Sequence, residues 1–114
     1  MTTFNLKFAT RNTKALNTVS NDITIVKMGW DKKTESIVIV GSDNKVRTCR
    51  TKLADKTQLP AFAKALRYAI ANGSTVSLIA AGGFSTEKWF SGFRFTGGFD
   101  QEMSARAALG LSTD

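Results

Sequence analysis

The feature of the sequence that most constrains its fold is a series of three short β-branched segments joined by two polar turns. The segments are Ile23–Trp30, Ser36–Val40 and Lys45–Thr51. They are separated by Asp31-Lys32-Lys33-Thr34 and by Gly41-Ser42-Asp43-Asn44, whose residue types favour tight reversals of the chain. β-Branched residues are enriched in strands because their side chains pack well on a pleated surface. The pattern therefore predicts an antiparallel meander.

The first of these segments changes the face that carries its apolar side chains. Ile23 and Ile25 share one face of an extended chain, whereas Val26, Met28 and Trp30 share the other. This change of phase, with Gly29 beside it, predicts a β-bulge or strong coiling of the strand. A small barrel needs such a bend in order to close.

The hydrophobic period changes between Leu59 and Ala71, which predicts one amphipathic helix. Pro60 suits the first turn of this helix, and Asn72-Gly73 supplies a stop after it. The apolar residues recur at three- and four-residue spacing, at Leu59, Phe62, Ala63, Leu66, Ala69 and Ile70.

Further strands are predicted on both sides of these elements. Thr3–Ala9 and Thr75–Ala80 alternate between apolar and polar residues, and Glu87–Phe95 is rich in aromatic residues. Gly82-Gly83 begins the loop that precedes the aromatic strand.

The order of the predicted elements is three or four strands, one helix and two strands. This order matches the OB-fold, a five-stranded barrel in which a helix lies between the third and fourth strands. We therefore expect a mainly β protein with one α-helix and an OB-fold-like five-stranded barrel. An open antiparallel sheet covered by one helix fits the same order. Residues 1–99 are predicted to form a single β-rich domain, and residues 100–114 a short C-terminal tail that is either helical or flexible.

The composition argues against an enzyme. The 114 residues include no histidine and one cysteine, Cys49, which excludes common zinc sites and histidine-dependent triads. Cys49 without a histidine is a poor nucleophile and suits a small, semi-buried position in a strand. The nine acidic residues are scattered rather than clustered. We expect no catalytic residue, no metal and no cofactor.

The sequence also lacks targeting and membrane segments. No run of about 18 apolar residues is present, so no membrane partner is expected. Residues 1–7 lack the charged and then apolar order of a signal peptide. A single cysteine agrees with a reducing compartment. We expect a cytoplasmic protein, located in the host cytoplasm if the chain is viral.

The balance of charge indicates a polyanionic partner. Sixteen lysines and arginines stand against nine acidic residues, which gives a net charge of +7, while the last fifteen residues are weakly acidic. A basic body of this kind favours nucleic acid as the partner. Binding a single strand requires cations that follow the phosphates and flat side chains that stack on bases.

Both kinds of side chain occur in the predicted strand that ends at Phe95. With a period of two, one face carries Lys88, Phe90, Gly92 and Arg94, and the other carries Trp89, Ser91, Phe93 and Phe95. We predict that the second face is core and that the first is a nucleic-acid surface with an exposed Phe90. The alternative is that Phe90 packs under the C-terminal segment. Trp89 is a further candidate for stacking, although its parity favours the core.

Trp30 is a second candidate for base stacking. It ends a predicted strand beside Lys32 and Lys33, so a base could stack on the indole while the lysines contact phosphates. The alternative is a core tryptophan that closes one end of the barrel.

Three cations crowd one short predicted strand. Lys45 and Arg47 share a face with Cys49, whereas Arg50 lies on the other face. Cations on both faces indicate that one face is fully solvated and available to phosphates. The alternative is an ordinary surface strand that charge keeps soluble.

The stretch from Ser36 to Phe95 resembles the small single-stranded DNA-binding proteins of tailed phages that replicate linear genomes by protein priming. The shared pattern is a strand and turn over Val38–Lys45, a strand at Val46–Thr51, a helix ending near Ile70, and the paired aromatics Trp89-Phe90. Between them lie Thr75-Val76-Ser77-Leu78-Ile79 and a Gly/Ser tip at residues 82–85. The resemblance implies a protein that coats displaced single strands with little sequence preference.

We therefore predict a nucleic-acid-binding domain that coats and protects single-stranded DNA during phage DNA replication. An RNA-binding protein is one alternative, and a protein-interaction module or inhibitor acting on a host protein is another. Exposed strand edges would allow homo-oligomers or cooperative assembly on DNA. The predicted stacking residues are Trp30, Phe90 and Trp89, and the predicted phosphate-binding residues are Lys32, Lys33, Lys45, Arg47, Arg50, Lys88 and Arg94.

Overall fold

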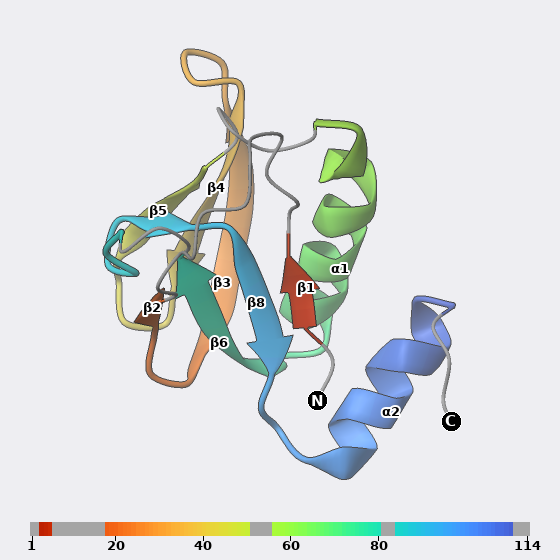
Figure 1. Ribbon diagram of the computed structural model, residues 1–114. Helices are drawn as coiled ribbons and strands as arrows, with labels where there is room; N and C mark the ends of the chain where they lie inside the picture. Colours follow the sequence, from red (N-terminus) through yellow and green to blue (C-terminus); the bar gives the residue numbers. More distant parts are fainter. Residues whose placement is uncertain (1–2, 6–17, 51–55, 81–83, 111–114) are drawn as a thin grey trace.

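The computed structural model describes residues 3–5, 18–50, 56–80 and 84–110 of the chain (Figure 1). The strands are β1 (Thr3–Asn5), β2 (Thr18–Val19), β3 (Ile23–Asp31), β4 (Ser36–Gly41), β5 (Val46–Cys49), β6 (Thr75–Ala80), β7 (Trp89–Phe90) and β8 (Gly92–Phe95). A short 3-10 helix (Lys56–Gln58) precedes α1 (Leu59–Ala71), and α2 (Phe99–Ala108) follows β8. The protein is mainly β, as predicted.

The expected number of elements, five strands and one helix, is wrong. Eight strands and two α-helices occur in the described residues. The aromatic strand predicted over Glu87–Phe95 is divided at Ser91 into β7 and β8, and the two-residue strand β2 forms in a segment that reads as a polar loop. The second helix, α2, lies almost entirely within residues 100–114, which were predicted to be either helical or flexible. Residues 6–9 of the first predicted strand lie outside the described part of the chain.

The predicted meander is confirmed by the strand pairing. β3 pairs antiparallel with β4, and β4 pairs antiparallel with β5. The register between β3 and β4 shifts between Ile25 and Lys27, which confirms the predicted irregularity in this strand. The turns that contain Lys32 and Asn44 connect these strands, as the residue types predicted.

The remaining pairings curl the sheet strongly (Figure 1). β5 runs parallel to β7, β8 pairs antiparallel with β6, and β6 pairs antiparallel with the first residues of β3. Only Ser91 separates β7 from β8. The hydrogen-bonded strands follow the open order β1-β8-β6-β3-β4-β5-β7, and β7 adjoins β8 along the chain. Strand β1 adds to the outer side of β8.

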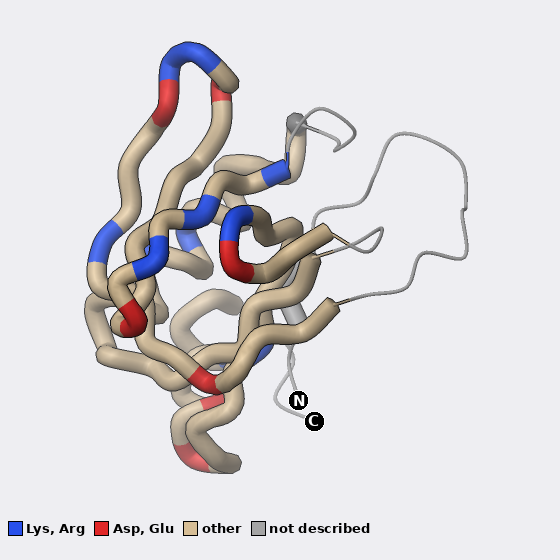
Figure 2. Tube along the Cα trace, turned by 90° about the vertical axis from the view of Figure 1, so that its left-hand side faces the viewer, with Lys and Arg blue, Asp and Glu red and all other residues tan. Residues whose placement is uncertain are grey.

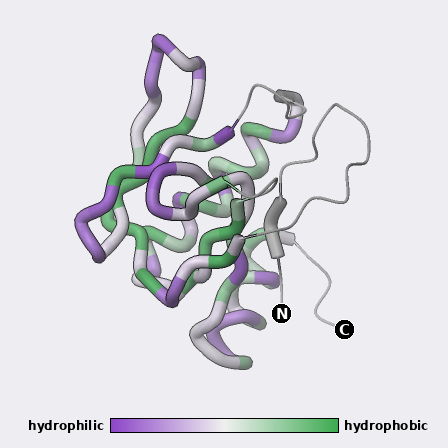
Figure 3. The backbone as a smooth tube through the Cα atoms, turned by 60° about the vertical axis from the view of Figure 1, so that its left-hand side comes forward, coloured by the Kyte–Doolittle hydropathy of each residue, from purple (hydrophilic) through white to green (hydrophobic). Residues whose placement is uncertain are grey.

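The core lies between the curled sheet and helix α1. The helix buries Phe62, Ala65, Leu66 and Ala69, and the Phe62 ring lies 5.6 Å from the Phe93 ring in an edge-to-face arrangement. Hydrophobic positions concentrate in the strands, whereas the hairpin tip of β3 and β4 is hydrophilic (Figure 3). The other large buried hydrophobic side chains are Ile23, Ile25, Ile37, Ile39, Val76, Leu78, Ile79, Phe90 and Phe95.

Two further features complete the fold. Cys49 is 1% exposed, and burial raises the pKa of its thiol to about 12, so the thiol stays protonated at neutral pH. Helix α2 carries Asp100 and Glu102 in its first turn and Arg106 in its last, which suits the helix dipole.

Neither α1 nor α2, nor any other helix in the described ranges, is long and apolar enough to span a membrane.

Candidate nucleic-acid interface

The prediction of an exposed Phe90 is wrong. Its side chain is 0% exposed, and its ring stacks on the Phe62 ring with the centroids 6.0 Å apart. Phe90 therefore belongs to the core, beneath helix α1, and is not accessible to a nucleobase.

The physical reason is an extra residue at Ser91. Gly92 pairs with Ile79 in the sheet, and the backbone N–H of Ser91 also donates to the Ile79 carbonyl at 2.8 Å. Two residues of one strand thus face a single residue of its partner, which reverses the alternation of side chains beyond that point. Phe90 and Phe93 consequently both point into the core. Trp89 is half-buried instead and pairs with Thr48 of β5.

The prediction that Arg47 contacts phosphates is also contradicted by its burial. Its side chain is 3% exposed, and its guanidinium donates to both carboxylate oxygens of Asp43, at 3.1 and 2.8 Å. Its Nε donates to the carbonyl of Thr86. Arg47 pairs with the buried Ile39 across the sheet, so its face is the core face. Gly41 leaves room for the ion pair, because a Cβ there would lie 2.7 Å from both partners.

Hydrogen bonds from Arg47 hold the pKa of Asp43 at about 2, against its ordinary value of 3.8. The pair joins the turn before β5 to the segment before β7, because Arg47 also reaches Thr86. The ion pair between Arg47 and Asp43 is therefore structural. It also fixes the segment that leads into Trp89.

The other predicted cations differ in how accessible they are. Lys32, Lys33 and Lys88 are exposed. Lys45 is also exposed, but its ammonium lies 2.8 Å from the Glu87 carboxylate. Arg94 is half-buried, and its strand position lies between β1 and β6, at a register shared with Ser77. Lys and Arg positions occur at the hairpin tip, where acidic positions adjoin them on both strands, and across the middle of the view, while further acidic positions lie in the middle and at the lower end (Figure 2).

Arg50, Phe84 and Trp89 form a surface cluster that we call the aromatic patch. The Arg50 guanidinium carbon lies 3.4 Å from the centroid of the Phe84 ring and 5.7 Å from that of Trp89. The two rings contact each other edge to face, with their centroids 6.5 Å apart. Phe84 is 40% exposed. The patch therefore presents aromatic and cationic groups at the surface.

Backbone hydrogen bonds position this patch. A turn at Ser85 directs the chain back, since its carbonyl accepts from the N–H of Trp89 at 3.0 Å. The N–H groups of Thr48 and Arg50 then donate to the carbonyls of Lys88 and Phe90, at 2.9 and 3.0 Å. These bonds hold Trp89 against β5, next to Arg50.

The aromatic patch borders a hollow of about 260 Å³. Its other walls include Thr34 and Ser36 of the β3–β4 hairpin and Thr48 of β5. The Ser36 hydroxyl donates to the Cys49 carbonyl at 2.8 Å, which ties the hairpin to β5. The patch thus lies between a hairpin tip that carries Lys32 and Lys33 and a segment that carries Lys88.

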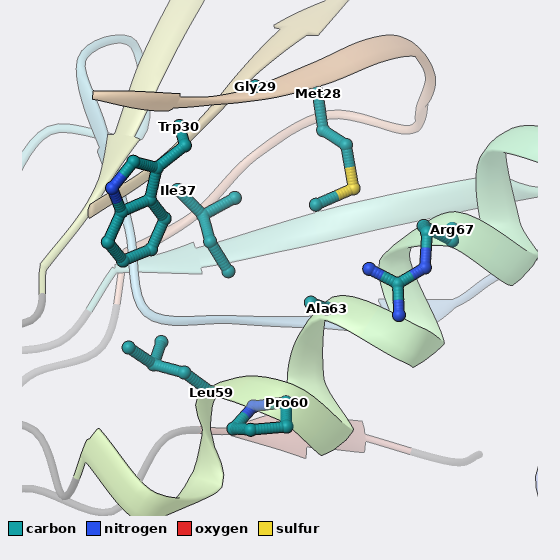
Figure 4. A pocket seen from close by; sticks show the side chains of 8 residues that line it. All are labelled: Met28, Gly29, Trp30, Ile37, Leu59, Pro60, Ala63 and Arg67. Carbon is teal, nitrogen blue, oxygen red and sulfur yellow. The ribbon is translucent and has the colours of Figure 1, made fainter. Parts of the chain in front are cut away.

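Trp30 lies on the other side of the same hairpin and is 55% exposed, so the alternative of a core tryptophan is wrong. It borders a second and larger hollow of about 600 Å³ between the hairpin and helix α1 (Figure 4). We call this hollow the helix groove. Its side-chain walls are Met28, Trp30 and Ile37 from the hairpin and Leu59, Pro60, Ala63 and Arg67 from the helix.

The structure brings together Trp89 and Arg50, both of which were predicted from the sequence, and Lys88 is the chain neighbour of Trp89. Phe84 and Arg67 were missed. An aromatic residue in a polar loop next to glycines, as at Phe84, was the available signal, whereas nothing local distinguishes Arg67. Among the described residues, no three Cys, Asp or Glu side chains gather where they could hold a metal ion. No protein-family model, curated protein or solved structure matches the chain.

Proposed function

We propose that the protein binds single-stranded DNA without sequence preference and without catalysing a reaction, on an OB-fold-like barrel. The order of strand pairing supports this architecture. A meander of β3, β4 and β5 is followed by α1, β6 and the divided strand β7–β8, with β5 parallel to β7. On this assignment β1, β2 and α2 are additions to the barrel.

The position of the aromatic patch is the observation that carries the proposal. OB-folds bind oligonucleotides on their second and third strands and on the loops that follow the first and fourth strands. Counted from β3, these elements are β4, β5, the turn of the β3–β4 hairpin and the segment between β6 and β7. Thr34, Ser36, Thr48 and Phe84, which border the hollow, lie on these elements, while Arg50 directly follows β5 and Trp89 begins β7.

The chemistry of the patch suits bases of any identity. Every base has a π-face, so stacking on Trp89 or Phe84 is tolerant of sequence. Phe84 covers one face of the Arg50 guanidinium, and the opposite face of this planar group can stack on a base. Lys32, Lys33 and Lys88 flank the patch as cations for the phosphates.

Trp89→Ala is expected to weaken binding of a thymidine oligomer by about 1–3 kcal/mol, the usual contribution of one stacked base. Fluorescence anisotropy of a labelled oligomer measures the affinity. Phe99→Ala is the matched control, because Phe99 is an aromatic residue that is 74% exposed on α2 and borders neither hollow, so the affinity of this variant should stay unchanged. Competition with duplex DNA and with an RNA oligomer tests the class of ligand. Absence of binding at low salt, or equal affinity for duplex DNA, would contradict the proposal.

Replacing Lys32 and Lys33 together with glutamine is expected to make binding less sensitive to salt. Each phosphate contact contributes about 0.7 to the slope of log K against log salt concentration for a single strand, so the slope should fall by about 1.4. Titrations at several salt concentrations measure it. Lys64→Gln removes an exposed charge from α1, outside both hollows, and should leave the slope nearly unchanged. An unaltered slope in the double variant would remove the hairpin tip from the interface.

A further inference from the structure

The helix groove has the dimensions and the lining of a ligand site. Its volume of about 600 Å³ lies within the range of about 300–1,000 Å³ typical of small-molecule pockets. Its walls are apolar except at its rim, where the Trp30 indole and the Arg67 guanidinium stand on opposite sides (Figure 4). A flat, exposed aromatic ring facing a cation across an apolar floor suits a planar group that carries a negative charge nearby.

The groove and the aromatic patch share one wall, the β3–β4 hairpin. Ser36 and Ile37 are neighbours on β4 and point to opposite faces, so Ser36 borders the hollow of the patch and Ile37 borders the groove. Trp30 pairs with Ile37 and therefore faces the groove. Lys32 and Lys33 are exposed at the tip of this wall, where Asp31 and Glu35 flank them in the chain. A single strand that leaves the patch over the tip would find cations along its path.

We propose that the helix groove is a second nucleotide subsite for the same DNA strand. A base stacks on Trp30 over the apolar floor, and Arg67 contacts a phosphate beside it. This inference rests on the proposed function and extends it, because the strand then wraps over the hairpin tip instead of ending at the aromatic patch. Continuity with the patch and the positive charge of Lys32, Lys33 and Arg67 favour nucleic acid over an acidic or apolar protein partner as the occupant.

The two tryptophans allow each subsite to be observed separately. Trp89→Phe leaves Trp30 as the reporter of the groove, and Trp30→Phe leaves Trp89 as the reporter of the patch. Each variant is titrated with thymidine oligomers of about 4 and about 16 nucleotides, the limits of site size for one OB-fold. The long oligomer is expected to quench both reporters. If the oligomer quenches Trp89 but leaves Trp30 emission unchanged, the proposal of a second subsite is wrong and the proposed function still holds. The helix groove would then be a site for a protein partner. If neither reporter responds, both proposals fail.

Affinities of alanine variants provide the second readout. Trp30→Ala is expected to weaken binding of the long oligomer roughly 5- to 150-fold and to leave binding of the short oligomer unchanged. Trp30→Phe, which keeps a flat ring, should restore most of the affinity. Val26→Ala is the matched control, because Val26 is 57% exposed on the same strand and borders neither hollow. An equal loss for both oligomers would overturn the proposal, since it would place the effect of Trp30 in the patch or in the fold.

Arg67→Gln tests the phosphate contact in the groove. The salt dependence of the long oligomer should fall by about 0.7, the contribution of one contact, while that of the short oligomer stays the same. Lys64→Gln, one turn earlier on α1, should change neither. A salt dependence of the long oligomer that is the same in Arg67→Gln as in the wild type would overturn the assignment of Arg67.

Discussion

Phe90→Ala is expected to lower the free energy of unfolding by about 3–5 kcal/mol, the usual cost of removing a buried phenylalanine. The ring is fully buried and stacks on Phe62 of α1, so its removal leaves a cavity where the helix meets the sheet. Denaturation by urea, followed by circular dichroism, measures the change. A loss of this size is a large share of the 5–15 kcal/mol that stabilises a typical domain.

Replacing the neighbouring Trp89 is expected to affect DNA affinity more than stability. Trp89 is half-buried in the aromatic patch, so Trp89→Ala should reduce DNA affinity at a smaller cost in stability than Phe90→Ala. The two variants together test the extra residue at Ser91, because it alone decides which of the two aromatics faces the core. A Phe90→Ala protein that keeps wild-type stability and loses only DNA affinity would show that the alternation predicted from the sequence was right after all.

Local elements with an unbroken period could be predicted closely. The helix predicted from Leu59 to Ala71 and the strand predicted from Thr75 to Ala80 have the bounds of α1 and β6. Both are continuous elements, and each keeps a single hydrophobic period from its first residue to its last. The irregularity in β3 was also predictable, because large apolar side chains lie on both sides of it and reveal the change of phase.

The irregularity at Ser91 was not predictable in the same way. Ser91 and Gly92 carry no large side chain that would reveal the phase, so the aromatic residues on either side appeared to belong to one regular strand. The assumption of one regular strand therefore predicted Phe90 at the surface and Trp89 in the core. Only the pairing of Ser91 and Gly92 with Ile79, fixed by the tertiary structure, settles which side chain is buried.

The candidate site depends on contacts between distant segments. Phe84 meets Arg50 only because the segment before β7 returns along β5, and Arg67 and Trp30 border one groove only because α1 lies beside the hairpin. Arg47 illustrates the opposite error. It shares its face with Cys49, and that parity indicated the core, but its charge favoured a solvated position. Asp43 compensates the buried charge, which composition alone does not show.

Asp43→Ala is expected to destabilise the fold by about 3 kcal/mol, because it leaves the Arg47 guanidinium buried without its carboxylate partner. The value is at the low end for buried pairs, since the Asp43 side chain keeps 30% exposure. Glu87→Gln is the matched control, because Glu87 forms an ion pair with Lys45 at the surface, and it should have little effect.

The difference in the free energy of unfolding between the wild type and Asp43→Ala should depend on pH. This dependence distinguishes loss of the ion pair from simple loss of packing. The pKa of Asp43 is lowered from 3.8 to about 2 in the folded protein. A carboxyl with a depressed pKa stabilises the fold above its unfolded pKa, and this contribution is lost as the pH falls through the folded pKa. The stability difference between the wild type and Asp43→Ala should therefore be full above about pH 5 and shrink toward pH 2. Urea denaturation at a series of pH values measures it. A difference that stays constant over this range would mean that the carboxylate charge does not stabilise Arg47, and that its side chain acts only by filling space.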